Sequence, residues 1–174
     1  DGRTADGPRH ATAWCRAGLL DTDAVACHGQ RGPFGECAHP GLRVTVEMPD
    51  SIGVAQAMLD TTVSYAGVRQ QFGRPIGSFQ AVKHACADML LTISVARQLV
   101  SASVRKPEPR AVSMAKSYAT ETAVAVAGKA MQLHGGIGYT WESGLHVYLK
   151  RAALNRSLYG SPAEHRARIA QRYR

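Results

Sequence analysis

Apolar residues recur at intervals of three and four along most of the chain after residue 42, which is the spacing of one face of an α-helix. Pro49 marks either the start of the first helix or a bend in it, because proline has no N–H to donate. Ser161 can cap the last helix, and Pro162 suits its first position. The pattern predicts five helices, at about 50–72, 79–104, 110–134, 144–153 and 162–172.

The apolar faces of the first three helices define the predicted core. The first helix directs inward Ile52, Ala55, Met58, Leu59, Val63 and Ala66. The second directs inward Val82, Ala85, Cys86, Met89, Ile93, Ala96, Leu99 and Val100. The third is rich in alanine, and small side chains let helix axes approach closely.

Glycine and proline separate the predicted helices. The first connection contains Gly73, Pro75 and Gly77, and the second contains Pro107 and Pro109. A glycine run after residue 134 ends the third helix, since glycine adopts the positive φ of a helix C-cap. Short connections of this kind join antiparallel neighbours. The sequence therefore predicts an all-α fold, an antiparallel four-helix bundle without strands.

Residues 1–41 differ from the rest of the chain, so we place a domain boundary between them and the bundle of residues 42–174. They hold seven of the 17 glycines and three of the four cysteines, and they lack Lys, Ser, Asn, Ile, Met and Tyr. No helix or strand period is present. This composition fits a disordered tail or the translation of a GC-rich gene in the wrong reading frame, and we favour the second interpretation.

Composition and charge narrow the functional classes. At 174 residues and 45% apolar content, the chain fits one domain with a core. The net charge of +8 permits nucleic-acid binding, but the sequence has no known nucleic-acid-binding motif, so we expect no nucleic-acid partner. Bound anions would account for part of the charge. No apolar run approaches the roughly 18 residues of a membrane span, so we expect no membrane partner and a cytoplasmic location.

The four cysteines lack the spacing of a disulfide framework and would stay reduced in the cytosol. Cys27, His28, Cys37 and His39 could together hold zinc, but they lack a C-x-x-C pair, and we expect no metal site.

Polar side chains crowd the predicted end of the first helix. Arg69, Gln71 and Arg74 flank Phe72, so a cation, an amide and an aromatic face are presented together. A guanidinium group is suited to phosphate or pyrophosphate. At the end of the third helix, Gly135 and Gly136 would let backbone N–H groups approach a phosphate, although a helix C-cap explains them almost as well.

These two strings carry a family resemblance. The run Y-A-G-V-R-Q-Q-F-G-R-P-I-G-S-F-Q at 65–80 and the run Q-L-H-G-G-I-G-Y-T at 132–140 resemble the C-terminal helical domain of acyl-CoA dehydrogenases, over about residues 43–172. The resemblance implies FAD as cofactor, usually one held mainly by a neighbouring subunit, with Arg69 on its pyrophosphate. It also implies further flavin contacts from Gln71, Phe72, Gln132, Gly135 and Gly136.

The resemblance further implies removal of an α-proton and a β-hydride from an acyl-CoA thioester, with FAD as the hydride acceptor. In most members the base is a glutamate in a Y-E-G-T-like segment, and Tyr159 stands in its place here. Tyrosine is a poor base at neutral pH. Other members carry the glutamate on the first bundle helix, where this chain has Arg43. Glu47 follows one turn later and is an alternative base, but a glutamate on a helix is usually a solvated charge, so we expect that here and leave the catalytic residue unknown.

The string from Leu145 to Arg166 resembles an actinobacterial-type branch of the family. In that branch, subunits without the usual base can pair with competent subunits in heterotetramers, some of which act on CoA thioesters of steroid side chains. Two hypotheses follow. The chain is part of a FAD-dependent dehydrogenase that works as a homo- or heterotetramer, or it is a non-catalytic subunit that completes the flavin site of a sister subunit. On its own, the bundle is expected to bind FAD weakly and to be inactive.

Overall fold

The computed structural model describes residues 40–171, and most of the irregular segment 1–41 lies outside the described residues, as do Cys27, His28, Cys37 and His39. The helices are α2 (Pro40–Val68), α3 (Gln80–Arg105), α4 (Pro109–His134), α5 (Leu145–Ser157) and α6 (Pro162–Ala170). Two short strands, β1 (Gln70–Gln71) and β2 (Arg74–Pro75), and two 3-10 turns, Ile76–Ser78 and Gly135–Tyr139, lie in the connections.

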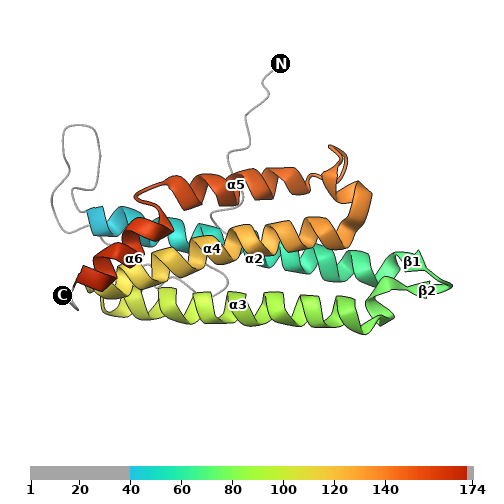
Figure 1. Cartoon of the computed structure of the whole chain (residues 1–174), viewed down its shortest axis with the longest axis horizontal. Helices are drawn as coiled ribbons and strands as arrows, with labels where there is room; N and C mark the ends of the chain where they lie inside the picture. The colour runs from blue at the N-terminus through green and yellow to red at the C-terminus, as the bar shows by residue number, and fades with distance from the viewer. Residues whose placement is uncertain (1–39, 172–174) are drawn as a thin grey trace, which may run out of the picture. The chain divides into compact units, whose positions relative to one another are not determined.

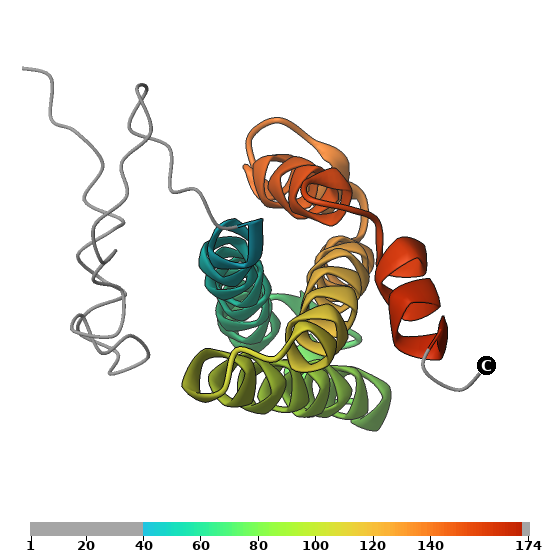
Figure 2. The same cartoon turned by 90° about the vertical axis from the view of Figure 1, so that its left-hand side faces the viewer.

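The described chain is an all-α bundle, as predicted. Helices α2, α3, α4 and α5 lie roughly side by side with short connections, and the shorter α6 leans against α4 (Figures 1 and 2). Helix α4 is the central element, because it packs against α2, α3, α5 and α6. Its inward residues Ala115, Ala119, Ala123 and Ala127 are fully or almost fully buried. Small side chains at these positions allow four neighbours to surround one helix.

The predicted apolar faces are largely confirmed. On α3, Met89, Ile93 and Val100 are buried, as their spacing indicates. On α2 the prediction is wrong at Val63, which is 53% exposed, whereas Thr62 is fully buried. The Thr62 hydroxyl donates a 2.7 Å hydrogen bond to the Met58 carbonyl within its own helix. A polar side chain satisfied in this way can occupy a core position, which apolar periodicity does not detect.

The first connection differs from the prediction. Helix α2 continues through Pro49 and ends at Val68, four residues before the predicted end. The chain then forms a two-stranded antiparallel hairpin, in which Gln71 pairs with Arg74, although no strand was predicted. Phe72 (φ 54°) and Gly73 (φ 75°) form its tip. Positive φ at both central residues is the geometry of a type I′ hairpin turn. An Asn-Gly pair would have signalled this turn, and Phe-Gly does not.

Helix α3 has the length and apolar composition of a membrane-spanning helix, and among the described residues it alone does. Our expectation that no segment would qualify is wrong on this point. In the fold, α3 packs along α2 and α4 with one face buried, as the core helix of a soluble bundle does. Such a helix is therefore weak evidence for a membrane span.

Candidate functional site

A cavity of about 450 Å³ lies where the end of α2, the hairpin and the end of α4 meet. Five of the six residues that the sequence assigns to a cofactor line it. They are Arg69, Gln71, Gln132, Gly135 and Gly136. The two strings that carry these residues are about sixty positions apart in the chain, and the antiparallel packing of α2 and α4 brings them together.

Backbone and ring contacts fix the two halves of this cavity to each other. The Arg69 carbonyl accepts a 2.8 Å hydrogen bond from the Ile76 N–H, which folds the hairpin back onto the helix end. The ring of Tyr65 stacks on the ring of His134 at 4.3 Å, and its hydroxyl donates a 3.4 Å hydrogen bond to the His134 carbonyl. The His134 imidazole is buried and held by the Ala130 carbonyl at 2.8 Å. The cavity walls therefore belong to one packed unit.

The cavity offers donors that the described chain leaves unused. The side chains of Arg69, Gln71 and Gln132 have no hydrogen-bond or ion-pair partner among the described residues, and no carboxylate lines the cavity. Gly135 has φ 64°, and a Cβ atom at Gly135 or Gly136 would meet nothing within 4 Å. An unpaired guanidinium, two amides and open backbone suit a pyrophosphate group. These residues therefore fit the FAD that the family resemblance implies.

Phe72 lies apart from this cavity. It sits at the hairpin tip with 91% of its surface exposed and makes an edge contact with Phe79 at 6.1 Å between ring centroids. The Arg74 guanidinium lies over Phe79 at 4.1 Å and does not line the cavity either. The hairpin thus has an inner side that carries Arg69 and Gln71, and an aromatic tip that projects from the described chain.

Tyr159, which the family resemblance places where most members have their base, lies in the turn between α5 and α6. Its φ of 56° is unusual for a bulky residue and marks local backbone strain. His165 holds the strained residue by donating a 3.1 Å hydrogen bond from Nε2 to the Tyr159 carbonyl. Ser161 and Glu164 form a capping box that begins α6 directly afterwards. The turn is therefore fixed from its C-terminal side.

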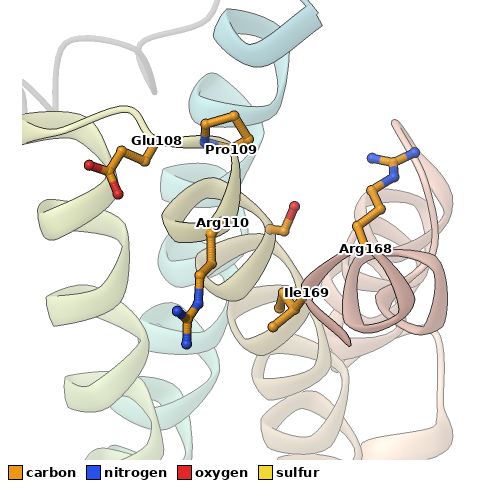
Figure 3. A pocket seen from close by; sticks show the side chains of 6 residues that line it. Glu108, Pro109, Arg110, Arg168 and Ile169 are labelled. Carbon is orange, nitrogen blue, oxygen red and sulfur yellow. The ribbon is translucent and has the colours of Figure 1, made fainter. Parts of the chain in front are cut away.

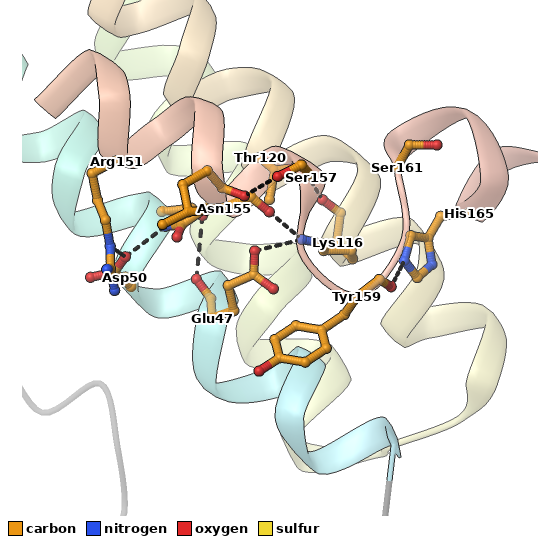
Figure 4. A network of polar contacts seen from close by, with 12 residues as sticks. Glu47, Asp50, Lys116, Thr120, Arg151, Asn155, Ser157, Tyr159, Ser161 and His165 are labelled. Carbon is orange, nitrogen blue, oxygen red and sulfur yellow. Dashed lines mark hydrogen bonds and ion pairs between the residues drawn. The ribbon is translucent and has the colours of Figure 1, made fainter.

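A buried polar network fixes the same turn from the other side (Figure 4). The Lys116 ammonium on α4 is fully buried and donates to Glu47 Oε1 at 2.7 Å and to the Asn155 carbonyl at 2.6 Å. The Asn155 amide donates in turn to Asp50 Oδ2 at 2.6 Å and to Ser51 Oγ at 3.2 Å. Lys116 thereby caps the last turn of α5 and ties it to α2.

The prediction for Glu47 is wrong. The side chain is 7% exposed and ion-paired, so it is not a solvated charge. Burial raises the pKa of the Glu47 carboxyl, and burial lowers the pKa of the Lys116 ammonium, while the pairing opposes both changes. The sequence did contain a sign of this buried ion pair, because Lys116 falls on the inward face of α4 between Ala115 and Ala119. A lysine on a small-residue core face needs a buried partner.

The family sequence pattern described as "Acyl-CoA dehydrogenase, C-terminal domain" matches residues 43–173. The chain belongs to the acyl-CoA dehydrogenase family. It is 44% identical over 131 residues to acyl-CoA dehydrogenase IpdE2 of Mycobacterium tuberculosis, which covers 74% of this chain and 41% of that protein. It is also 44% identical over 118 residues to acyl-CoA dehydrogenase FadE34 of the same organism, covering 64% of this chain and 17% of that protein.

Solved structures agree with this assignment. Butyryl-CoA dehydrogenase from Megasphaera elsdenii superposes with a TM-score of 0.74 at 26% identity, covering 77% of this chain and 36% of the other. PigA, solved with FAD and proline, superposes with a TM-score of 0.73 at 27% identity, over 77% of this chain and 36% of the other. The chain thus spans 41% of the length of IpdE2, 17% of that of FadE34 and 36% of each of these two solved structures.

A second cavity of the acyl-CoA dehydrogenase domain, about 390 Å³, lies between the start of α4 and α6. Figure 3 shows the side chains of Arg110 and Arg168 pointing in different directions there, so they do not converge on one anion. Within residues 40–171, no three His, Cys, Asp or Glu side chains are grouped as metal ligands. The cavity at Arg69 therefore remains the best candidate site of the described chain.

Proposed function

We propose that this chain is the C-terminal part of a FAD-dependent acyl-CoA dehydrogenase, in which it contributes to FAD binding and to subunit assembly. One observation carries the proposal. Side chains with unused donors converge with open glycine backbone on one cavity, from the two strings that the family resemblance identifies. When bound, FAD supplies the acceptor for the β-hydride of the acyl-CoA substrate.

The residues of the cavity have separate tasks in this proposal. The Arg69 guanidinium balances the charge of the pyrophosphate and donates to it in a bidentate manner. The side-chain amide groups of Gln71 and Gln132 add neutral hydrogen-bond donors for the same pyrophosphate. The missing Cβ atoms at Gly135 and Gly136 leave room for phosphate oxygens against the backbone.

Phe72 supports the idea that the flavin is held mainly by a neighbouring subunit. An aromatic side chain that is 91% exposed at the tip of a hairpin is poorly placed for a ligand of its own chain. We propose that the hairpin reaches across a tetramer interface, where Phe72 covers the adenine side of the partner's FAD. Arg69 and Gln71 would then complete that site from the same hairpin.

A second function is favoured by Tyr159. Because it replaces the usual base, the chain could be a non-catalytic subunit that completes the flavin site of a sister subunit in a heterotetramer. The string from Leu145 to Arg166, which resembles the actinobacterial-type branch, supports this alternative. It also leads us to propose a CoA thioester derived from a steroid side chain as the substrate class.

Both proposed functions require that this chain contributes to FAD binding, so a measurement of FAD affinity tests them together. In the full-length gene product that contains this chain, Arg69→Ala should weaken FAD binding by about 10- to 150-fold, the equivalent of a charged hydrogen bond worth about 1.5–3 kcal/mol. Arg74→Ala is the matched control, since Arg74 is an arginine of the same hairpin that lies outside the cavity. Equal FAD dissociation constants for the two variants would contradict the proposal.

Flavin reduction by acyl-CoA then separates the two functions. A gene product that is reduced when purified alone is the enzyme. If reduction occurs only after a sister subunit is added, the chain is the non-catalytic partner.

A further inference from the structure

His134 lines the cavity at the end of α4, and the proposed function gives it no task. Its side chain is buried, with 7% of the residue exposed. Among the described residues that line the cavity, Tyr65 and Arg69 of α2 are the only others with a titratable or charged side chain. Tyrosine and arginine ordinarily change charge only near or above about pH 10. Histidine is therefore the one residue type of this wall that titrates between about pH 5 and pH 8.

The imidazole of His134 is held in one orientation. Its Nδ1 lies 2.8 Å from the carbonyl oxygen of Ala130, one turn earlier in α4. A carbonyl oxygen can only accept a hydrogen bond, so Nδ1 carries a hydrogen and donates it. The ring is also stacked on the ring of Tyr65, at 4.3 Å between centroids and an interplanar angle of 21°. The chemistry that His134 can offer to the cavity is therefore left to Nε2.

The Nε2 atom of His134 is free and reached by solvent. It has no hydrogen-bond partner within the described chain. It is also not one of the buried side-chain atoms that lack a partner there, which belong to Glu47, Arg97, Asn155 and His165. An unpartnered nitrogen that is not buried must be open to water, and the cavity is the opening that His134 lines. A ligand in the cavity can therefore approach Nε2.

The charge of the ring decides what Nε2 can bind. In a neutral ring whose Nδ1 carries the hydrogen, Nε2 has a lone pair and can only accept. A pyrophosphate presents negatively charged oxygens that also only accept, so neutral Nε2 cannot bond to it. A protonated Nε2 donates a charge-assisted hydrogen bond to such an oxygen. The negative charge of the anion in turn favours the charged form of a neighbouring histidine.

We propose that His134 is a further contact for the FAD pyrophosphate and that it binds this anion only with a proton on Nε2. This inference rests on the proposed function. The proton comes from solvent and forms an N–H bond, so FAD binding is accompanied by proton uptake. FAD affinity then rises as the pH falls through the range in which histidine titrates. Arg69 carries its charge throughout this range, and His134 adds a second cation at the same anion only when protonated.

FAD affinity at two pH values tests the proposal. The apoprotein of the full-length gene product, assembled with its sister subunit where one is required, is titrated with FAD at pH 6 and pH 8. The dissociation constant of wild type should rise by at least about fivefold from pH 6 to pH 8, because a charge-assisted hydrogen bond is lost. His134→Phe keeps a ring against Tyr65 but cannot be protonated. Its dissociation constant should stay within about twofold over this range and should approach that of wild type at pH 8.

A second histidine serves as the matched control. His165 is also buried but does not line the cavity. His165→Gln should therefore keep the pH dependence of FAD binding that wild type shows. His134→Gln is its counterpart at the cavity and replaces His134→Phe if that variant does not fold. The glutamine amide is polar but does not titrate, so the pH dependence should again be lost.

Proton uptake can also be measured directly. Calorimetric titrations with FAD at pH 7, in two buffers with different enthalpies of ionisation, give the number of protons bound per FAD. Wild type should take up more protons than His134→Phe, with a difference of up to about one proton per site. His165→Gln should take up as many as wild type.

A purely structural role of His134 would give a different result. Loss of FAD affinity by the same factor at pH 6 and pH 8 in the His134 variants would overturn the proposal. Equal proton uptake by wild type and His134→Phe would also overturn it, as would wild-type FAD affinity that does not change with pH. The proposed function stands in these cases if Arg69→Ala still weakens FAD binding. If Arg69→Ala binds FAD as tightly as wild type at both pH values, the proposed function itself is overturned.

Discussion

Lys116 Nζ lies 2.7 Å from Glu47 Oε1, although the two residues are 69 positions apart and neither side chain is more than 7% exposed. This ion pair joins α2 to the central helix α4, and the Asn155 carbonyl extends the connection to α5. Burying two charges is costly, so removing either partner would leave the other charge uncompensated in the core. The contact with Asn155 fixes the turn at Tyr159 from the side opposite to His165.

Breaking the pair should destabilise the fold. Lys116→Met leaves Glu47 charged and buried, so the free energy of unfolding should fall by about 3–5 kcal/mol in urea denaturation. Combining it with Glu47→Leu removes both charges and should recover most of the loss. The surface pair of Arg166 and Glu121 is the control, and Arg166→Ala should change stability by about 0–1 kcal/mol. A double variant no more stable than Lys116→Met would contradict this account.

His165 should make stability dependent on pH. Burial lowers the pKa of its imidazole in the folded state, so the unfolded chain takes up a proton first as the pH falls below about 6.5. The unfolded state then binds more protons than the folded state, and the free energy of unfolding decreases with acidification. His165→Gln keeps a side chain that can donate to the Tyr159 carbonyl but cannot titrate. Its melting temperature should fall less than that of wild type between pH 7 and pH 5, and an equal fall would refute the assignment.

Replacing either of two glycines by alanine should change the stability of the fold, and the two changes should have opposite signs. At Gly138 an added Cβ would lie 2.5 Å from the Met131 carbonyl oxygen, so Gly138→Ala should force the loop beside the cavity to move and should lower stability. At Gly128, in α4, a Cβ would meet nothing within 4 Å, so Gly128→Ala should stabilise the helix by about 0.5–1 kcal/mol. Thermal unfolding of both variants tests this pair. Equal shifts would mean that the Gly138 contact does not constrain the loop.

Phe72 should show a conflict between stability and function. Its positive φ strains the hairpin, and its side chain is almost fully exposed, so Phe72→Gly should raise stability by roughly 1 kcal/mol. The same change should weaken FAD binding in the assembled full-length gene product, because the aromatic cover of the adenine is lost. Urea denaturation and flavin titration measure the two effects. Unchanged FAD affinity would remove Phe72 from the cofactor site.

Local periodicity was sufficient to predict the helices and most of their buried faces. The spacing of three and four residues predicted that Met89, Ile93 and Val100 are buried, because these residues share one face of α3. The residues of the cavity were selected because two strings resemble the acyl-CoA dehydrogenase family, and packing of α2 against α4 brings those strings together.

The features that sequence missed depend on contacts between distant segments. Glu47 gave no sign of burial, since its partner is on another helix and the pair has no local period. The hairpin was missed because its tip uses Phe72 at a positive φ that few bulky residues adopt. Strain at Tyr159 is likewise tolerated because His165 holds its carbonyl from a separate helix, which a local pattern does not reveal.

The most direct test of the account is a cryo-electron microscopy or crystal structure of the full-length gene product with FAD. We predict that the Arg69 guanidinium lies within hydrogen-bonding distance of the flavin pyrophosphate, and that Gln132 and the backbone at Gly135 and Gly136 lie against the same cofactor. A bound FAD whose pyrophosphate lies away from this cavity in every subunit would contradict the account.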